Sequence, residues 1–350
     1  MALCGALVSS LLAGVAACGA PEGDAALARG EAALVTCPVI TACNAAPPAP
    51  GPARAFRNFG SWVLSSLNQA SVKHRGRDQL VVAGQPQWIL AKLAYGGIES
   101  ALTDEDVDLY VLRGCGSTWE KLDTVRTTTG THAAVEGVAD TGGRVYYQIP
   151  AARALGVGRH RVRLVVAGDL TATELTIEVV APGTKIFVSD VDGTLTTNEL
   201  EEVFSSIFGQ LPQANPSAAA QLDALVALGY RPFYLTARAE ALTERTRAFL
   251  AARGFPVGTV HTSLDGLGLT GAPAAAFKTA EITLLGQKGL TPTLGFGNTD
   301  TDAQAYVDGG IAPAAHRLFF QFTDAAHGGT RFDDYAGLDG VIDGLPAACQ

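Results

Sequence analysis

Two carboxylates that stand two positions apart, Asp190 and Asp192, are the residues of this sequence best suited to chemistry. They belong to the stretch KIFVSDVDGTLTTN, residues 185–198. The first carboxylate could attack phosphorus as a nucleophile, and the second could donate and accept protons as a general acid and base. Carboxylate oxygens also bind hard cations such as Mg²⁺. Both side chains are therefore candidate catalytic residues and candidate metal ligands.

The residues around this pair predict where it lies in the fold. The run from Ile186 to Ser189 is typical of a buried parallel strand, which ends at Asp190. A tight turn follows, in which the backbone N–H groups of Val191 to Gly193 could bind an anion, and a helix is expected from residue 199 onward. Open α/β sheets bind their ligands at the carboxyl ends of the strands. The two carboxylates are therefore expected to converge on a ligand site.

From Gly183 onward, strand patterns alternate with helical patterns, which predicts a doubly wound parallel sheet. The second strand ends at Thr236-Ala237-Arg238, and a later strand runs into the acidic turn from Asn298 to Asp302. The expected strands are 186–189, 231–235, 293–297 and 318–322, the last near a sheet edge, and the expected helices are 217–228, 240–253 and the stretch around Lys278.

Later residues supply the other groups that phosphoryl transfer needs, which are those that compensate charge on the phosphate oxygens. Thr236 could hydrogen-bond a phosphate oxygen, and Lys278 could neutralise the phosphate and Asp190. Asn298 and Asp302, with an oxygen of Asp190 and the carbonyl or side chain of Asp192, could hold one Mg²⁺. The predicted catalytic residues are Asp190, Asp192, Thr236 and Lys278. The predicted substrate-binding residues are Val191, Gly193, Thr194, Thr236, Ala237, Arg238 and Lys278.

Other polar residues near these motifs have structural explanations. Asp300 and Thr197 are expected to cap helices rather than to bind a ligand. Arg238 could reach a substrate or form a surface ion pair, and the sequence leaves both open. His261 and His316 are expected to be structural.

The order of these motifs resembles that of a known superfamily. DVDGT, then Thr236 at a strand end, then a lone Lys278, then a strand ending in acidic residues looks like the four-motif order of the haloacid dehalogenase-like phosphohydrolases. DVDGTLT, YLTARA, the pair Phe277-Lys278 and a Gly-Asn sequence followed by DAQAY resemble more closely the catalytic domain of the lipin family of phosphatidate phosphatases. That domain is shared with the Nir/RdgB phosphatidylinositol-transfer proteins. The resemblance covers residues 185–322.

The lipin resemblance implies a Mg²⁺-dependent phosphatase that forms an aspartyl-phosphate on Asp190 and hydrolyses phosphatidate or a related lipid phosphomonoester. Two features depart from it: Thr299 replaces the usual Arg after Gly-Asn, and the amphipathic N-terminal helix of lipins has no counterpart. One alternative is a module that binds phosphatidate or phosphoinositide without turnover, like the Nir/RdgB relatives. Those relatives tend to lack the first carboxylate, which this chain has as Asp190. Another alternative is a phosphatase of non-lipid monoesters.

The spacing of the motifs predicts an open site. Between the first motif and Thr236 there is room for about two helices but not for a cap domain, and no large insertion precedes Lys278. Open sites suit substrates that remain in a membrane, whereas small metabolites usually need a lid that excludes water. A phospholipid or membrane surface is therefore the expected partner, and the chain is expected to be a monomer.

Residues 55–182 show short strands separated by turn residues, which predicts an all-β immunoglobulin-like sandwich before the catalytic domain of residues 183–350. Alternation is clearest where Val162, Leu164 and Val166 would face the core. The basic cluster from His74 to Asp78 could touch an anionic group, or form a solvated loop or an interdomain ion-pair cluster. The candidate strands are 80–82, 88–94, 107–112, 144–149, 160–166 and 174–180.

The first residues of the chain resemble an export signal. Residues 1–18 are uncharged and mostly apolar, and Val15-Ala16-Ala17-Cys18 resembles a bacterial lipoprotein processing site, although no Lys or Arg precedes Cys18. The expectation is an exported protein, either a bacterial lipoprotein lipidated at Cys18 or a periplasmic protein. Residues 19–54 are expected to form an extended, poorly ordered Pro/Ala-rich linker.

Composition limits the remaining possibilities. The formal net charge is −9, which argues against broad binding to nucleic acid. The four cysteines outside the signal are even in number, which fits disulfides in an oxidising compartment. Cys37 and Cys43 are close enough to close a small loop, and Cys115 could instead be a free buried thiol. The four are Cys37, Cys43, Cys115 and Cys349.

Overall fold

The computed structural model describes residues 40, 43–69, 71–197, 210–290 and 292–349. Cys18, Cys37 and the helix expected from residue 199 lie outside them. Among the described residues, no helix combines the length and the apolar character that crossing a bilayer requires. The two domains described below belong to one compact unit.

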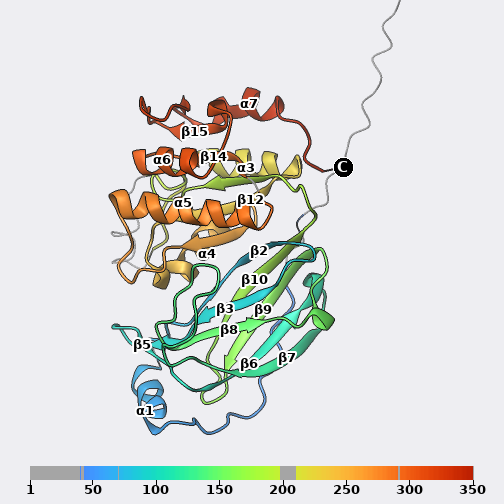
Figure 1. The fold of residues 1–350 in the computed structure, drawn as a ribbon, viewed down its shortest axis with the longest axis vertical. Helices are drawn as coiled ribbons and strands as arrows, with labels where there is room; N and C mark the ends of the chain where they lie inside the picture. The colour runs from blue at the N-terminus through green and yellow to red at the C-terminus, as the bar shows by residue number, and fades with distance from the viewer. Residues whose placement is uncertain (1–39, 41–42, 70, 198–209, 291, 350) are drawn as a thin grey trace, which may run out of the picture. The chain divides into compact units, whose positions relative to one another are not determined.

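The first domain is a β-sandwich (Figure 1). One sheet has the strand order β1-β3-β8, the other has the order β2-β10-β9-β6-β7, and β4 and β5 form a separate pair. Because side chains alternate across a strand, each sheet turns every second residue inward, and Ile89, Leu109 and Ile177 are fully buried in the resulting core. The strands are β1 (Arg75–Arg77), β2 (Gln79–Val82), β3 (Trp88–Lys92), β4 (Ala94–Tyr95), β5 (Ser100–Ala101), β6 (Asp106–Leu112), β7 (Trp119–Arg126), β8 (Arg144–Gln148), β9 (Gly158–Val166) and β10 (Ala172–Val180).

The predicted sandwich is confirmed, together with its clearest alternating strand. Val162, Leu164 and Val166 of β9 are fully buried. Arg161 and Arg163 point to the other face, where both pair with Glu174 of β10. Strands β1, β5 and β7 were not predicted; β7 buries only Leu122, so it lacks an apolar alternation.

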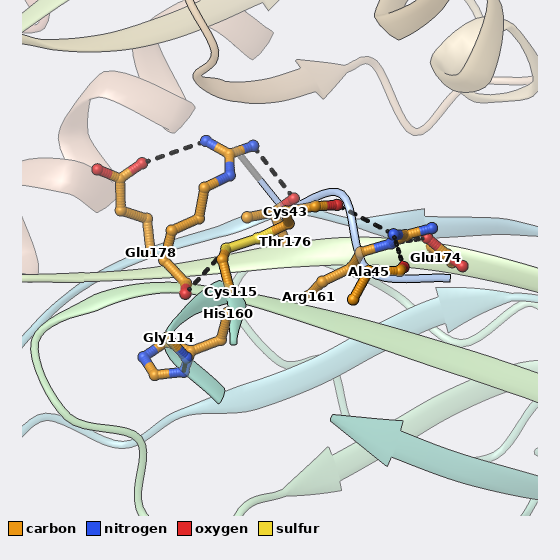
Figure 2. Close-up of a disulfide and its surroundings, with 10 residues drawn as sticks. Cys43, Ala45, Gly114, Cys115, His160, Arg161, Glu174, Thr176 and Glu178 are labelled. Carbon is orange, nitrogen blue, oxygen red and sulfur yellow. Dashed lines mark hydrogen bonds and ion pairs between the residues drawn. A yellow bond between two sulfur atoms is a disulfide. The ribbon is translucent and has the colours of Figure 1, made fainter. Parts of the chain in front are cut away.

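The segment before the sandwich is held against it by side chains that satisfy its backbone carbonyl groups. Arg161 Nη1 donates to the carbonyl oxygens of Cys43 and Ala45, each at 3.1 Å, and Trp119 Nε1 donates to that of Ala46 at 2.8 Å. Figure 2 shows Arg161 between this segment and Glu174. For residues 43–46 these contacts correct the expectation of a poorly ordered linker, and most of the predicted linker, residues 19–39, lies outside the described residues.

A disulfide joins Cys43 to Cys115, with the two Cα atoms 4.5 Å apart (Figure 2). Cys115 lies in the turn that follows β6, beside the segment that carries Cys43. The expected small loop between Cys37 and Cys43 and the alternative of a free Cys115 are therefore both wrong. The covalent link ties the start of the described chain to the sandwich.

Helix α1 (Phe59–Asn68) precedes the sandwich and was not predicted. Its buried side chains are Ser61 and Ser65, and Ser65 Oγ donates to Asp169 Oδ2 at 2.5 Å. Phe59 and Trp62 stack on each other with exposures of 77% and 52%. The helix thus departs from the usual amphipathic pattern, in which the apolar face is buried: it packs Leu64 on the sandwich core but leaves Phe59 and Trp62 exposed.

The second domain is a doubly wound α/β domain with a six-stranded sheet in the order β13-β12-β11-β14-β15-β16, all parallel. One hydrophobic cluster joins α3, α4 and α7 to one face of the sheet, and another joins α5 and α6 to the opposite face (Figure 1). The strands are β11 (Ile186–Ser189), β12 (Arg231–Thr236), β13 (Thr259–Thr262), β14 (Pro292–Gly297), β15 (Arg317–Phe320) and β16 (Thr330–Phe332). The helices are α3 (Ala218–Ala227), α4 (Thr243–Ala252), α5 (Gly271–Gln287), α6 (Asp300–Asp308) and α7 (Asp339–Asp343).

The predicted fold class of this domain is confirmed, and the strand expected at residues 318–322 is β15, next to the edge strand β16. One cap prediction is wrong. Thr299, not Asp300, is the N-cap of α6, since its hydroxyl accepts the N–H of Asp302 and the Asp302 carboxylate accepts the N–H of Thr299. Asp300 is the first helical residue and is exposed.

Strand β1 and the residue after it join the two domains. Asp78 is 2% exposed, and its carboxylate accepts the backbone N–H groups of Thr176 and Val260 at 2.8 and 3.0 Å. It also pairs with Arg247 of α4, with 2.8 Å between Oδ1 and Nη2. Of the alternatives for the cluster from His74 to Asp78, the interdomain ion-pair cluster is the one found.

Replacing Asp78 tests how much this junction contributes to stability. Asp78→Ala should lower the free energy of unfolding by about 1–3 kcal/mol, because the N–H groups of Thr176 and Val260 lose their buried acceptor, whereas Arg247 keeps its contact with Glu244. Chemical denaturation followed by circular dichroism measures the change. Asp343→Ala, at an exposed position, should stay within about 0.5 kcal/mol of the wild type, and equal losses in the two variants would contradict the assignment.

Candidate active site

Three neighbouring parallel strands deliver the predicted residues to one edge of the sheet. In the register of the sheet, Ser189 of β11 lies between Tyr234 of β12 and Phe296 of β14. Asp190 follows directly and donates its N–H to the carbonyl oxygen of Phe296 at 2.9 Å. Thr236 ends the strand on one side, and Asn298 follows the strand on the other side. The carboxyl ends of the strands therefore form the site, as predicted.

Lys278 is the centre of the site. It comes from the middle of α5, and its Nζ donates to Asp190 Oδ1 and to Asp302 Oδ1, each at 2.6 Å. Lys278 and Asp190 are each 4% exposed, and Asp302 is fully buried. Three residues that are distant in the sequence thus meet in one buried ion-pair cluster, as the order of the motifs along the chain predicted.

The start of α6 fixes the second carboxylate of this cluster. Asp302 Oδ2 accepts the backbone N–H groups of Asn298 and Thr299 at 3.0 and 3.1 Å and the Thr299 hydroxyl at 2.8 Å. A Cβ atom on Gly297 would lie 2.4 Å from the Cβ of Asp302, so only glycine fits there. With Oδ2 held by the helix cap, Asp302 offers Oδ1 to Lys278.

Burial and charge perturb both members of the central pair. Burial is the largest cause that raises the pKa of Asp190 to about 7; Lys278 opposes it, and the carboxylates of Asp302 and Asp192 add to it. Burial would lower the pKa of Lys278, but Asp190 and Asp302 outweigh it and hold the pKa of the ammonium above its ordinary value. The lysine is therefore a permanent cation, and Asp190 changes charge near neutral pH.

Asp192 turns toward the strand beside it rather than toward Lys278. Arg238 donates to its carboxylate through Nε and Nη2, with a shortest distance of 2.7 Å, and Thr236 Oγ1 donates to its Oδ2 at 2.9 Å. Arg238 Nη1 also donates to Thr246 Oγ1 at 3.1 Å. Arg238, which is 7% exposed, is thus a buried partner of Asp192 and not a surface ion pair. Asp192, the predicted acid/base, therefore accepts hydrogen bonds from two groups of the Arg238 guanidinium at once.

The turn between the two carboxylates is closed by its own hydrogen bonds. Gly193, at a φ of +69°, donates its N–H to Thr196 Oγ1 at 2.9 Å. Thr194 Oγ1 donates to Asn298 Oδ1 at 2.9 Å and lies 3.4 Å from Asp190 Oδ2. Val191 is fully buried in the core. In the turn predicted to bind an anion, the Gly193 N–H therefore already donates to Thr196 and is not available to an anion.

A cavity of about 490 Å³ opens onto this edge of the sheet. Its polar lining includes Asp190, Asp192, Arg238, Lys278 and Asn298, and Ala237 also lines it; all six residues were predicted from the sequence. Its apolar lining includes Leu242, Leu267 and Leu269, and Leu267 is 97% exposed. The sequence analysis did not predict these leucines; for Leu267 and Leu269 the available signal was the three leucines in the otherwise polar and glycine-rich loop SLDGLGL, residues 263–269. The cavity combines a charged floor with an apolar rim.

Asp190, Asn298 and Asp302 are the residues whose side-chain oxygen atoms could hold a magnesium ion at this site, although no complete set of acidic ligands is preformed. Among the described residues, no three His, Cys, Asp or Glu side chains gather to hold a cation, and the Asp192 carboxylate contacts Arg238 instead of facing Asp190 and Asp302. Asp190, Asp302 and Lys278 together have one negative charge in excess when both carboxylates are ionised, which adds to the effect of burial in raising the pKa of Asp190. Mg²⁺ binds hard oxygen atoms, and its positive charge would balance the excess negative charge of this cluster.

Family models match both domains. Residues 72–179 match the model described as PITM 1-3, beta-sandwich domain, and residues 187–319 match the model described as PITM 1-3, LNS2 domain. This chain carries the β-sandwich and LNS2 domains of PITM 1-3 proteins. LNS2 domains belong to the haloacid dehalogenase-like superfamily, so the predicted superfamily and its Nir/RdgB relationship are confirmed.

Curated relatives agree with this assignment. Human membrane-associated phosphatidylinositol transfer protein 1 is 32% identical over 203 residues, which cover 57% of this chain and 15% of that protein. The human type 3 protein is 30% identical over the same share of this chain and 19% of its own length. Protein retinal degeneration B of Drosophila melanogaster is 28% identical over 70% of this chain and 18% of that protein. The chain spans less than a fifth of the length of these relatives.

These relatives correct the predicted localisation. The PITM and RdgB relatives are animal proteins, the human ones membrane-associated by name, and not bacterial lipoproteins. The expectation of an exported bacterial lipoprotein or periplasmic protein is therefore wrong. Its error was to assign the apolar run before Cys18 by resemblance to a processing site without the basic residues that such signals carry.

The ion-pair cluster predicts how Asp190 responds to the loss of its cation. Lys278→Met should raise the midpoint of the Asp190 titration by about 1 to 3 pH units, because an adjacent positive charge favours the ionised carboxylate. Carboxyl-carbon nuclear magnetic resonance (NMR), with Asp190→Asn to assign the signal, measures the midpoint. Lys185→Met removes an exposed lysine and should leave it unchanged; an unchanged midpoint in Lys278→Met as well would refute the pairing.

Proposed function

We propose that this chain is a phosphoric monoester hydrolase that acts through an aspartyl-phosphate on Asp190, with phosphatidate or a related lipid phosphate as its substrate. The observation that supports this most is the buried contact of Lys278 with both Asp190 and Asp302 beside an accessible cavity. A carboxylate, a fixed cation and oxygen donors are the groups that phosphoryl transfer uses. The lipin-type assignment is part of this proposal.

In the proposed reaction, a carboxylate oxygen of Asp190 attacks phosphorus and the bond to the leaving alkoxide breaks. Asp192 donates a proton to the alkoxide, which leaves as an alcohol, and then accepts a proton from the water that attacks the aspartyl-phosphate. Inorganic phosphate leaves and both aspartates return to their starting state. Lys278 compensates charge on the phosphoryl oxygens throughout. Mg²⁺, held by Asp190, Asn298, Asp302 and the backbone carbonyl of Asp192, would add to that compensation when bound.

The substrate class rests on the rim of the cavity and on the relatives. Leu242, Leu267 and Leu269 place apolar side chains beside the charged floor, as a substrate with an anionic head and acyl chains requires. The relatives are named phosphatidylinositol transfer proteins, which supports a phospholipid ligand at a membrane surface. The acidic net charge gives no support to a nucleic acid partner.

A second candidate is a domain that binds phosphatidate or phosphoinositide without turnover. The grip of Arg238 on Asp192 favours it, because a carboxylate held by a guanidinium fork is a poor proton donor. Catalysis then requires that the substrate phosphate take over Arg238 and release Asp192. A third candidate is a phosphatase of soluble monoesters, which shares every catalytic residue with the first.

A phosphate-release panel separates these candidates. The purified chain should release phosphate from phosphatidate in mixed micelles in the presence of Mg²⁺ and much less from soluble monoesters. Asp190→Asn should lower the rate by about 10³-fold or more because the nucleophile is lost, while Asp308→Asn, exposed on α6, should match the wild type. Absence of release from every substrate, together with binding of Asp190→Asn to phosphatidate liposomes, would instead support the binding domain.

The titration of Asp190 predicts how metal binding depends on pH. Below about pH 7 the carboxyl is protonated, so each further unit of acidification should weaken Mg²⁺ binding by up to about tenfold. Calorimetric titration with MgCl₂ at about pH 5.5, 6.5 and 7.5 measures this slope. Asp190→Asn should bind weakly and with no such slope across this range; a slope equal to that of the wild type would show that another group titrates.

A further inference from the structure

Two glutamates of the second domain reach into the sandwich, each close in sequence to a residue of the proposed active site. Glu240 stands two positions after Arg238, and Glu281 stands one helical turn after Lys278 on α5. Both are buried, with exposures of 7% and 6%. We infer that Glu240 and Glu281 are positioning residues, through which arginines of the sandwich set the location of Lys278 and of the phosphate-binding loop, residues 237–242, which carries Arg238 and is proposed to bind the substrate phosphate. The inference rests on the proposed function and deepens it.

Glu240 is gripped from two strands of the sandwich. Arg144 of β8 contacts both carboxylate oxygens, at 2.9 and 3.0 Å, and Arg75 of β1 adds a third contact at 3.0 Å. Burial acts to raise the pKa of Glu240, but Arg144 and Arg75 outweigh it and hold that pKa below its ordinary value. A fork of this kind fixes orientation as well as charge.

Backbone hydrogen bonds connect Glu240 to the residues that line the cavity. The Glu240 N–H donates to the carbonyl oxygen of Asp265 at 3.1 Å, and the Leu269 N–H donates to that of Ala237 at 2.8 Å. The Ser263 N–H donates to the carbonyl oxygen of Arg238 at 3.0 Å. The loop that holds Arg238 and the loop that supplies the apolar rim are therefore clamped together at the point where the sandwich holds Glu240.

Glu281 is held equally closely, by Arg77 of β1 and by His261 of β13. Arg77 Nη2 lies 2.5 Å from Glu281 Oε1, and His261 Nδ1 lies 2.6 Å from Oε2. His261 Nε2 lies 2.8 Å from the carbonyl oxygen of Asp78, so the ring links Glu281 to the sandwich a second time. Burial opposes ionisation, yet Arg77 and His261 bring the pKa of Glu281 down to about 2.

The location of Glu281 gives this contact leverage on the active site. Residues three apart on a helix share a face. The position at which Arg77 and His261 hold Glu281 therefore sets the rotation of α5 and the axial position of Lys278. A displacement of about 1 Å at a catalytic group costs on the order of 10²-fold in rate. A buried ion pair, by contrast, adds little net stability over apolar packing. Geometry is therefore the property that these pairs supply.

The chain contains a matched control at the other end of the sheet. Glu178 of β10 is also a buried sandwich carboxylate, 4% exposed, and it pairs with Arg159 and with Arg231. Arg231 begins β12, whereas Thr236 ends it, so this contact lies about 16 Å along the strand from the site. Glu178→Gln breaks the same kind of interdomain pair without touching either catalytic element.

The test compares Glu240→Gln and Glu281→Gln with Glu178→Gln in the full chain. Phosphate release from phosphatidate micelles should show kcat lowered by about 10- to 100-fold in Glu281→Gln, with KM close to that of the control. Glu240→Gln should mainly raise KM, since its loop binds the phosphate. A direct readout is the ¹H–¹⁵N NMR resonance of the Lys278 ammonium, assigned with Lys278→Met, which should be lost in Glu281→Gln and retained in Glu178→Gln.

The outcomes separate this inference from the proposed function. If the wild type releases no phosphate, the ammonium resonance still decides whether Glu281 positions Lys278. If Glu281→Gln does not fold, Arg77→Lys keeps the positive charge but loses the fork, and it should broaden or abolish the same resonance. The inference is overturned if the variants of Glu240 and Glu281 match Glu178→Gln in kcat, in KM and in the Lys278 resonance.

Discussion

The structure of the site depends on one buried ammonium group. Lys278 Nζ joins carboxylates from β11 and α6, and without that cation two aspartates would be buried side by side at a cost of several kcal/mol each. The lysine reaches them from α5, which packs on one face of the sheet, and Gly297 leaves room for Asp302. The order of the motifs along the chain follows from this geometry, since each group comes from a different element that ends at the same edge.

Much of this arrangement could be predicted from the sequence because it depends on strand ends. Asp190, Thr236 and Asn298 follow or end apolar runs that can hardly be anything but buried strands, and parallel strands bring their carboxyl ends together. The contact of Lys278 with Asp190 was predicted from the order of the motifs. Hydrophobic periodicity could not predict it, since the helix that carries Lys278 is apolar on nearly all sides. Those residues met as expected.

The remaining features depend on partners that a linear pattern does not contain. Asp192 binds Arg238 instead of water, and this contact depends on the geometry of both side chains. The Cys43–Cys115 disulfide depends on the path of the chain before the sandwich. Helix α1 was missed because it buries serines and exposes Phe59 and Trp62. Strand β1, the sequence RGR, has no apolar residue at all, because its arginines are buried by carboxylates of the other domain.

The hydrophobic core of the second domain includes residues from outside it. Leu80, Val82 and Val180 of the sandwich pack in the same cluster as Ile186, Val188, Ile282 and Leu285. A fragment that began near residue 183 would leave this cluster open to water, with a sticky apolar surface under α5. The two matched domains therefore share one hydrophobic cluster, and each needs the other to keep its apolar residues away from water.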